Sequence, residues 1–197
     1  MATMIVLAGP NGAGKSTLYA TRVAPFFSGP FINADIIQRD ELRDPSPEAS
    51  YTAAQIATER RAKHLAAGLD FVTETVFSHP SKLTLITDAQ ARGFQVRVMH
   101  VGVEFAEISV ARVNCRVQEG GHAVPEHKVR ERFDRGASLI RAAVLKADHG
   151  LVYDNSRLNE PPRHCLTFRS GNLVQTPPDL PQWISRLYRA DLVGVVS

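Results

Sequence analysis

A glycine-rich stretch near the start of the chain carries the clearest chemical signal. Residues 9–17 read GPNGAGKST, and residues 9–16 fit the pattern G-x-x-x-x-G-K-[ST] directly after the apolar run TMIVLA. Glycines at this spacing let the backbone turn its N–H groups toward an anion, while the lysine and the hydroxyl suit phosphates and Mg²⁺. The stretch predicts a site for a nucleoside triphosphate with Mg²⁺, formed by Gly9, Pro10, Asn11, Gly12, Ala13, Gly14, Lys15, Ser16 and Thr17.

A first carboxylate stands where the second strand would end. Asp35 closes the run PFINAD, and open α/β sheets bind their ligands at the carboxyl ends of strands. A carboxylate there can take the proton of a substrate hydroxyl during phosphoryl transfer. The alternative is that Asp35 is the N-cap of the helix that follows.

A second carboxylate lies in the otherwise apolar run FVTETVF. Glu74 would be costly there unless it were paired or bound to a cation. It is predicted to hold Mg²⁺ together with Ser16 or to accept a substrate hydroxyl, with a salt bridge to an arginine as the alternative. Polar side chains follow in the next loop, so the predicted substrate-binding residues are Asp35, Glu74, Thr75, Ser78 and Lys82.

Four arginines flank a break between two helical patterns, and this segment predicts a lid around residues 116–128. Arg112 and Arg116 are four apart, so they share one face of the first helix, and Arg132 and Arg135 are three apart on the second. Arginines beside a mobile segment are suited to stabilise a phosphoryl group in transfer. The alternative is that they cover solvated helix surface. Lys15, Asp35, Arg116 and Arg132 form the predicted catalytic set, and Arg116 and Arg135 are also expected to bind the nucleotide.

The class of nucleotide-binding protein can be narrowed by motifs that the sequence lacks. It contains neither an N-K-x-D guanine-reading motif nor an L-S-G-G-Q signature of transport ATPases. These absences favour a small-molecule kinase that uses ATP. A kinase of another metabolite or nucleoside, a non-transferring ATP-binding regulator and a DNA-associated ATPase are the alternatives, and a pure binding module has no need of a base such as Asp35.

The order of the expected elements predicts an α/β fold. Apolar strands at residues 3–8, 30–35, 70–77, 94–103 and 149–156 alternate with helical patterns, and this implies a parallel sheet with helices on both faces. Within the helix expected to begin at Pro47, Ser46 is the N-cap and Gly68 follows the end. Residues 163–194 read as a hairpin or edge strand followed by a helix.

Length and composition favour one domain of 197 residues, with a core at residues 1–156 and an extension at residues 157–197. Two distant cysteines favour free thiols packed as small apolar residues and a reducing compartment. The net charge of +3 comes without a polybasic tail, so a nucleic-acid partner is not expected. With neither a signal-peptide pattern nor a membrane-spanning run, a soluble cytoplasmic protein is expected.

Taken together, these motifs resemble the zeta toxin family of P-loop kinases, in particular its compact members. GPNGAGKST, INAD, ETVFSHPSKL, an arginine-flanked EGGHAVPE and YDNS occur in this order between residues 4 and 156. The resemblance implies a P-loop kinase-like αβα fold with a five-stranded parallel sheet, as in nucleotide and shikimate kinases. The chain differs from the larger toxins in its shorter length and in its lid sequence.

The resemblance also implies roles for individual residues and for partners. Lys15 would bind phosphate, Asp35 would act as base with help from Glu74, and Arg116 with Arg132 or Arg135 would stabilise the transferring group. The YDNS segment would lie near the adenine, which makes Asp154 and Asn155 predicted nucleotide-binding residues. Toxins of this family phosphorylate the 3′-hydroxyl of the amino sugar in UDP-N-acetylglucosamine and are inhibited by a small helical antitoxin protein.

Overall fold

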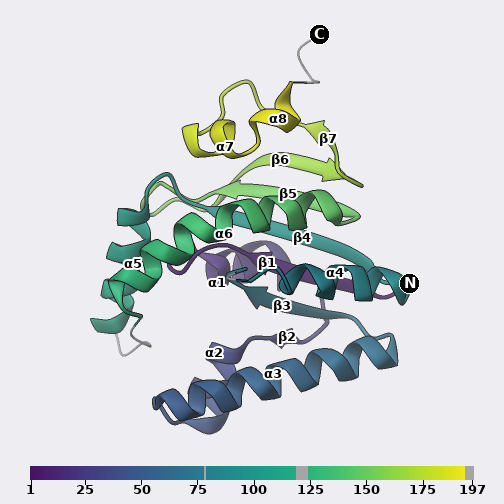
Figure 1. Cartoon of the computed structure of the whole chain (residues 1–197), viewed down its shortest axis with the longest axis vertical. Helices are drawn as coiled ribbons and strands as arrows, with labels where there is room; N and C mark the ends of the chain where they lie inside the picture. Colours follow the sequence, from purple (N-terminus) through teal and green to yellow (C-terminus); the bar gives the residue numbers. More distant parts are fainter. Residues whose placement is uncertain (78, 119–123, 194–197) are drawn as a thin grey trace.

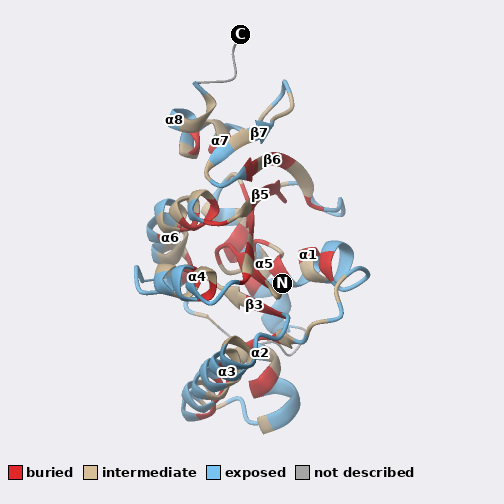
Figure 2. Cartoon of the chain, turned by 90° about the vertical axis from the view of Figure 1, so that its right-hand side faces the viewer, coloured by how far each residue is buried: buried red, intermediate tan, exposed pale blue. Residues whose placement is uncertain are grey.

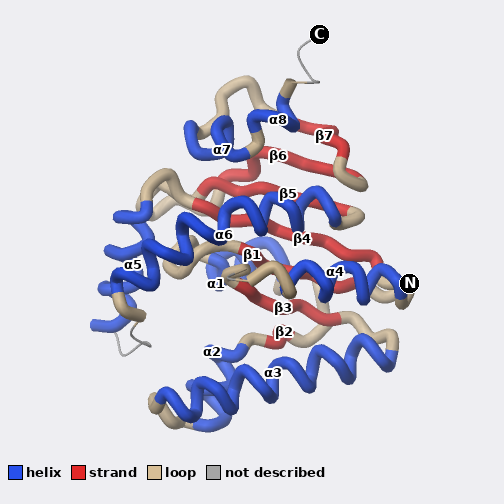
Figure 3. Tube along the Cα trace, viewed as in Figure 1, coloured by secondary structure: helices blue, strands red, loops and turns tan. Residues whose placement is uncertain are grey.

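The fold is built on one seven-stranded sheet. The computed structural model describes residues 1–77, 79–118 and 124–193, and its strand order is β2-β3-β1-β4-β5-β6-β7 (Figures 1 and 3). The first five strands in this order are parallel to one another, and β6 and β7 are antiparallel. The predicted five-stranded parallel sheet with an edge hairpin is therefore confirmed. The strand bounds are β1 Thr3–Ala8, β2 Phe31–Ile32, β3 Phe71–Thr75, β4 Gln95–Gly102, β5 His149–Asp154, β6 Arg163–Arg169 and β7 Asn172–Gln175.

Helices connect the parallel strands, as the alternating pattern predicts. Two of them, α1 and α2, continue into π-helical segments, η1 and η2. The long α3 begins at Pro47 behind the Ser46 N-cap and ends before Gly68, as predicted. The bounds are α1 Lys15–Leu18, η1 Tyr19–Val23, α2 Ala34–Ile36, η2 Ile37–Leu42, α3 Pro47–Ala67, α4 Lys82–Ala91, α5 Ala106–Gln118, α6 Glu126–Lys146, α7 Gln182–Leu187 and α8 Arg189–Leu192.

The central strands bury both of their faces, which explains why β1 is apolar from residue 4 to residue 8. Met4 and Val6 belong to the larger hydrophobic cluster, on the side of α3, α4 and α6, while Ile5 and Leu7 belong to a smaller cluster with Leu18 of α1. Figure 2 shows α4 and α6 on one side of the sheet and α1 on the other. A continuous apolar strand is what burial between two helical layers requires.

The C-terminal segment shares its core with the rest of the protein. Leu166 and Phe168 of β6 and Ile184 of α7 belong to the larger hydrophobic cluster. Trp183 donates a hydrogen bond from its indole nitrogen to Asp154 Oδ1 at 2.7 Å, and Tyr188 Oη lies 2.8 Å from His100 Nδ1. The described part of the extension, residues 157–193, to which the sequence assigns no chemistry, thus helps to hold β4 and β5 near their carboxyl ends.

Two smaller observations bear on the compositional expectations. Both cysteines are free, but only Cys165 is packed inside, since Cys115 is exposed. The expectation of two buried thiols is therefore wrong for Cys115. Within the described ranges, no helix has both the length and the apolar composition needed to cross a membrane.

The buried His100 predicts a pH dependence of stability. Burial lowers the pKa of His100 from 6.5 to about 3, so the folded state keeps the imidazole neutral while the unfolded chain protonates it. Between these values the unfolded state binds more protons, and the free energy of unfolding falls as the pH drops, by up to about 1.4 kcal/mol per pH unit. Urea unfolding of wild type and His100→Gln from neutral pH to about pH 4 measures this slope. The slope is expected to be shallower in His100→Gln, and equal slopes would contradict the assignment.

Candidate active site

The glycine-rich loop connects β1 to α1, where the motif requires it. Gly12 and Gly14 adopt φ values of +75° and +98°, which side chains rarely tolerate. A Cβ on Gly12 would lie 2.5 Å from the carbonyl oxygen of Ser109, and one on Gly14 would collide with the Asn155 amide. Both glycines are therefore fixed by backbone conformation and by close packing of the loop against its neighbours.

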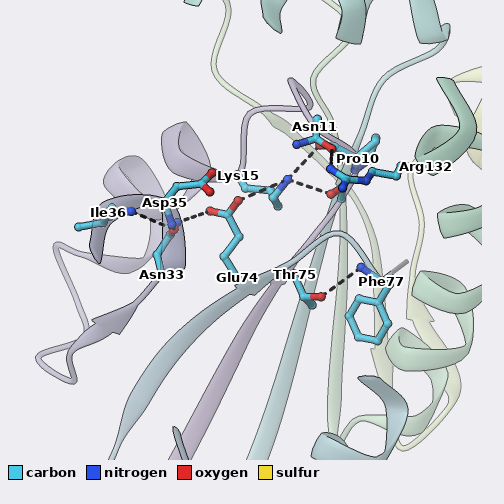
Figure 4. A network of polar contacts seen from close by, with 11 residues as sticks. Pro10, Asn11, Lys15, Asn33, Asp35, Ile36, Glu74, Thr75, Phe77 and Arg132 are labelled. Carbon is cyan, nitrogen blue, oxygen red and sulfur yellow. Dashed lines mark hydrogen bonds and ion pairs between the residues drawn. The ribbon is translucent and has the colours of Figure 1, made fainter. Parts of the chain in front are cut away.

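Lys15 is buried at the start of α1, and its ammonium is held by the loop itself. Nζ donates hydrogen bonds to the carbonyl oxygens of Gly9 and Pro10, each at 2.9 Å, and lies 3.4 Å from Glu74 Oε1 (Figure 4). Ser16 and Thr17, the next two residues, are exposed. The loop thus presents one buried cation and two accessible hydroxyls, which fits a phosphate chain and a cation bound to it.

A polar cavity of about 390 Å³ lies over this loop and is the candidate nucleotide site. Lys15, Ser16, Thr17 and Glu74 line it, together with Arg112 and Arg116 of α5. Within the described ranges, no cluster of three or more His, Cys, Asp or Glu side chains could hold a metal by itself.

Asn33 joins β2 to α2 and uses its whole side-chain amide. Its Oδ1 accepts hydrogen bonds from the backbone N–H groups of Asp35 (2.7 Å) and Ile36 (3.3 Å), and its Nδ2 donates to Glu74 Oε2 at 2.9 Å (Figure 4). Asn33 is therefore the N-cap of α2, and the alternative that assigns this cap to Asp35 is wrong. The Asp35 carboxylate is left available for other contacts.

Asp35 lines a second cavity, of about 270 Å³, which is the candidate acceptor site. Glu74 and Thr75 of β3, Lys82 of α4 and Arg132 of α6 line the same cavity. Glu74 borders both the nucleotide cavity and this one. The alternative that pairs Glu74 with an arginine is not what the structure shows, because its cationic partner is Lys15.

The arginines predicted to bind phosphate do not all lie at the same site. Arg132 donates a hydrogen bond to Asn11 Oδ1 at 3.3 Å, so it reaches the loop from the acceptor side (Figure 4). Arg116, with Arg112, borders the nucleotide cavity. The structure does not bring Arg135 to the loop: its side chain is 70% exposed and pairs with Glu131 at 2.6 Å, one helical turn away.

Two residues of the YDNS segment, Asp154 and Asn155, face different partners. Asn155 donates from Nδ2 to the Ala13 carbonyl oxygen at 2.8 Å, is buried, and lines the nucleotide cavity. Asp154 is turned away from that cavity, because its Oδ1 accepts hydrogen bonds from Ser156 Oγ (2.6 Å) and from Trp183. Asn155 therefore braces the glycine-rich loop, whereas Asp154 anchors α7.

Thr75 is the last residue of β3, and its side chain holds the backbone that follows the strand. Thr75 Oγ1 accepts a hydrogen bond from the backbone N–H of Phe77 at 3.1 Å, which helps to hold Phe77 at an unusual φ of 48°. Ser78 lies outside the described residues, as do residues 119–123 at the centre of the predicted lid. Two further site residues, Asn33 and Arg61, are not among the sequence predictions; only Asn33 had a signal, as a cap-type residue before a helix.

Another cavity, of about 320 Å³, lies between α6 and α7 and touches the glycine-rich loop through Pro10. Its walls are mainly apolar, with Phe133 of α6 and Trp183 of α7 among them. Catalysis of phosphoryl transfer depends on charged groups around the reacting atoms. The two polar cavities that meet at Glu74 are therefore the candidates for such chemistry.

Fold and loop together define the class: a mixed α/β protein with a mostly parallel sheet and a P-loop between β1 and α1. The sequence model of the Zeta toxin family matches residues 2–160. The chain belongs to the Zeta toxin family, and the predicted family is confirmed.

Individual relatives are distant. An uncharacterised protein of Haemophilus influenzae is 29% identical over 138 residues, which cover 66% of this chain and 91% of that protein. Among solved structures, two of the AvrRxo1-ORF1:AvrRxo1-ORF2 complex are similar to this chain. The structure with sulphate ions gives a TM-score of 0.69 and the structure with ATP gives 0.65, each at 15% identity over 100% of this chain. This chain spans 65% of that AvrRxo1 chain. The PezAT chromosomal toxin-antitoxin system of Streptococcus pneumoniae gives a TM-score of 0.60 at 15% identity, over 100% of this chain and 80% of that one.

The double role of Asn33 leads to a test. Asn33→Ala removes the α2 cap and the hydrogen bond to Glu74, so the free energy of unfolding should fall by about 1 kcal/mol or more. Because Asp35 and Glu74 lose their alignment, ATP turnover per folded molecule should fall roughly tenfold to hundredfold. Urea unfolding and ATP turnover measure the two effects.

Ser46→Ala is the matched control. Ser46 caps α3 by accepting a hydrogen bond from the Ala49 N–H at 3.1 Å, and it borders neither polar cavity. This variant should lose similar stability but keep normal turnover. If both variants lose turnover in proportion to stability, Asn33 has no role beyond capping.

Proposed function

We propose that the protein is an ATP-dependent kinase that transfers the γ-phosphoryl group to a hydroxyl of a small molecule. The observation that carries the proposal is the meeting of two polar cavities at Glu74. One contains the P-loop with Lys15 and Ser16, and the other contains Asp35 and Arg132. A donor site and an acceptor site with a shared wall are what direct transfer between two bound molecules requires. Family membership and the kinase-like fold support the same class of reaction.

On the donor side, the P-loop residues 9–17 would hold the phosphates of ATP. The Lys15 ammonium, which contacts the loop carbonyls and Glu74, would turn to the β- and γ-phosphate oxygens. Ser16 would ligate Mg²⁺ directly and Glu74 through water, and the ion would neutralise charge on the phosphates. Arg116 and Asn155 would complete the walls of the nucleotide site.

On the acceptor side, Asp35 would act as general base. The hydroxyl oxygen forms a bond to the γ-phosphorus while the bond between that phosphorus and the β,γ-bridging oxygen breaks. The hydroxyl proton goes to the Asp35 carboxylate, and the bridging electrons leave with ADP. Asn33 would keep Asp35 in place through the helix cap, and Arg132 would face the charge that spreads over the transferred group.

The acceptor and partner follow from family membership. We propose a nucleotide sugar such as UDP-N-acetylglucosamine as the acceptor, with Glu74, Thr75, Ser78 and Lys82 contributing to its site, and another small metabolite or nucleoside as the second choice. Because the PezAT neighbour is a toxin-antitoxin system, we also propose a small antitoxin protein as partner. As a separate proposal, the place of action is the cytoplasm, where an ATP-dependent kinase finds its ATP. A reading frame for a small helical protein beside the gene would support the partner.

Asp35→Asn separates a kinase from an ATP-binding regulator. The variant keeps the size of the side chain and leaves the Asn33 cap in place, so the fold and ATP binding should be unchanged. An amide cannot take the hydroxyl proton, and phosphoryl transfer should fall by roughly 10²–10⁴. Mass spectrometry of acceptors incubated with γ-labelled ATP measures transfer, and calorimetry measures ATP binding.

The control is Asp40→Asn, which removes a carboxylate that is 52% exposed and paired with Arg39. It should transfer like wild type. Normal transfer by Asp35→Asn would show that Asp35 is not the general base. If wild type and both variants phosphorylate no acceptor, the protein is an ATP-binding regulator and not a kinase.

Arginine variants on α5 and α6 test which arginines contact the phosphates. Arg132→Ala removes a charge that contacts the P-loop through Asn11, and Arg116→Ala removes one that borders the nucleotide cavity. Each should lower kcat by roughly 10²–10⁵ while stability changes by less than about 1 kcal/mol. Arg135→Ala, three residues from Arg132 and paired with Glu131 on the surface, should keep normal kcat. An equal loss in the Arg135 and Arg132 variants would contradict this division.

A further inference from the structure

A third polar cavity, of about 270 Å³, adjoins the candidate acceptor site on the side away from the P-loop. It lies between α3, β3 and α4. The two cavities share five lining residues: Thr58, Arg61, Glu74, Thr75 and Lys82. Two cations, Arg61 and Lys82, therefore stand where the two cavities join.

Arg61 is a partly buried guanidinium without an anionic partner among the described residues. Its Nη2 donates to the neutral hydroxyl of Thr58 at 2.8 Å, and no ion pair of the described chain includes it. Its neighbour Arg60, by contrast, forms two hydrogen bonds of 2.6 Å with the Glu41 carboxylate on the surface. Burial lowers the pKa of Arg61, which means that the surroundings disfavour its charge. A bound anion would offset that cost.

Thr73 gives an independent sign of a missing partner in the third cavity. Its side chain is only 1% exposed, it lines this cavity, and its hydroxyl has no hydrogen-bond partner in the part of the chain that the structure describes. A buried hydroxyl without a partner costs free energy. Other hydroxyl residues line the same cavity, among them Ser81, whose Oγ lies 2.9 Å from His79 Nδ1.

The third cavity is lined by a guanidinium, an ammonium and several hydroxyls, and also by the carboxylates of Glu74, which is paired with Lys15, and of Asp88. The two cations at the junction suit a phosphate or a carboxylate. None of the residues described as lining this cavity or the acceptor cavity is aromatic, so neither offers a ring on which a base could stack. Recognition in this region therefore depends on charge.

We propose that Arg61, Lys82 and Thr73 form an anion subsite that selects acceptors carrying a phosphate or carboxylate beyond the hydroxyl that is phosphorylated. The inference rests on the proposed kinase function, since it places the hydroxyl at Asp35 and the anion at the junction with the third cavity. A sugar phosphate or a hydroxy acid supplies such an anion directly, and a nucleotide sugar supplies it through its diphosphate. Arg61 and Thr73 are specificity residues in this scheme.

A binding experiment without catalysis tests the subsite. The P-loop is first saturated with Mg²⁺ and AMP-PNP, a non-hydrolysable ATP analogue, so that it cannot take the added anion. Inorganic phosphate and, in a parallel arm, malonate are then titrated by calorimetry. Wild type should bind at least one of them, and the stronger arm identifies the class of anion. Arg61→Gln should weaken that binding about tenfold or more, because a charge-assisted hydrogen bond is lost.

Lys63→Gln is the matched control, because Lys63 is an exposed lysine on the same helix and borders neither cavity. It should bind the anion like wild type. Thr73→Val, which removes only the hydroxyl, should weaken binding less than Arg61→Gln. If Arg61→Gln does not fold, Lys82→Gln provides the same test. Equal anion binding by wild type, Arg61→Gln and Lys82→Gln, or no binding by wild type in either arm, would overturn the proposal.

Transfer assays connect the subsite to the reaction. Acceptors are compared in pairs that differ only by a phosphate distant from the reacting hydroxyl, and wild type should prefer the phosphorylated member through a lower KM. That preference should shrink about tenfold in Arg61→Gln and stay in Lys63→Gln. If no acceptor is phosphorylated at all, the kinase proposal fails. The calorimetric titration still shows whether the anion subsite exists, because it measures binding without catalysis. A preference unaffected by Arg61→Gln would overturn the subsite alone.

Discussion

The placement of Glu74 is the constraint on which the site depends. This carboxylate projects from β3, between β1 and β2 in the sheet, and it is only partly exposed. A charge in that position requires partners, and it has two: the Lys15 ammonium at 3.4 Å and the Asn33 amide at 2.9 Å. Through Lys15 it contacts the P-loop, and through Asn33 it contacts the cap that positions Asp35. The two polar cavities are thus connected through one side chain.

The sheet order makes this arrangement possible. β3 pairs with β1 on one side and β2 on the other, all in parallel, so the carboxyl ends of the three strands meet at one edge. The P-loop follows β1, Asn33 and Asp35 follow β2, and Glu74 lies near the end of β3. Elements that are tens of residues apart in the chain therefore contribute to one site. The helices α5 and α6 bring arginines to the same edge, and the Asn155 side chain fixes the loop from β5.

Some of this site can be predicted from the sequence because its signals are local. The spacing of Gly9, Gly14 and Lys15 defines the loop, and a carboxylate inside an apolar strand, such as Glu74, signals a paired or ligand-bound charge. The parallel sheet follows from the alternation of strands and helices. These features depend on neighbouring residues, and a single sequence contains them.

Other features depend on contacts that sequence spacing does not determine. Asn33 and Asp35 are both typical cap residues, and only the backbone shows that Asn33 holds the cap. Arg135 lies on the same helix as Arg132, yet its side chain pairs with Glu131, one turn earlier, on the surface and does not reach the site. Asp154 faces away because Trp183, 29 residues later, binds it.

The most direct test of the account is the fate of the γ-phosphoryl group. Wild type and Lys15→Ala are incubated with labelled ATP, Mg²⁺ and a mixture of small metabolites, and the products are identified by mass. A phosphomonoester of one metabolite should form with wild type and be absent with Lys15→Ala, while thermal melting shows that both are folded. Release of the label only as inorganic phosphate, or equal product from both proteins, would contradict the assignment of this site as a kinase centre.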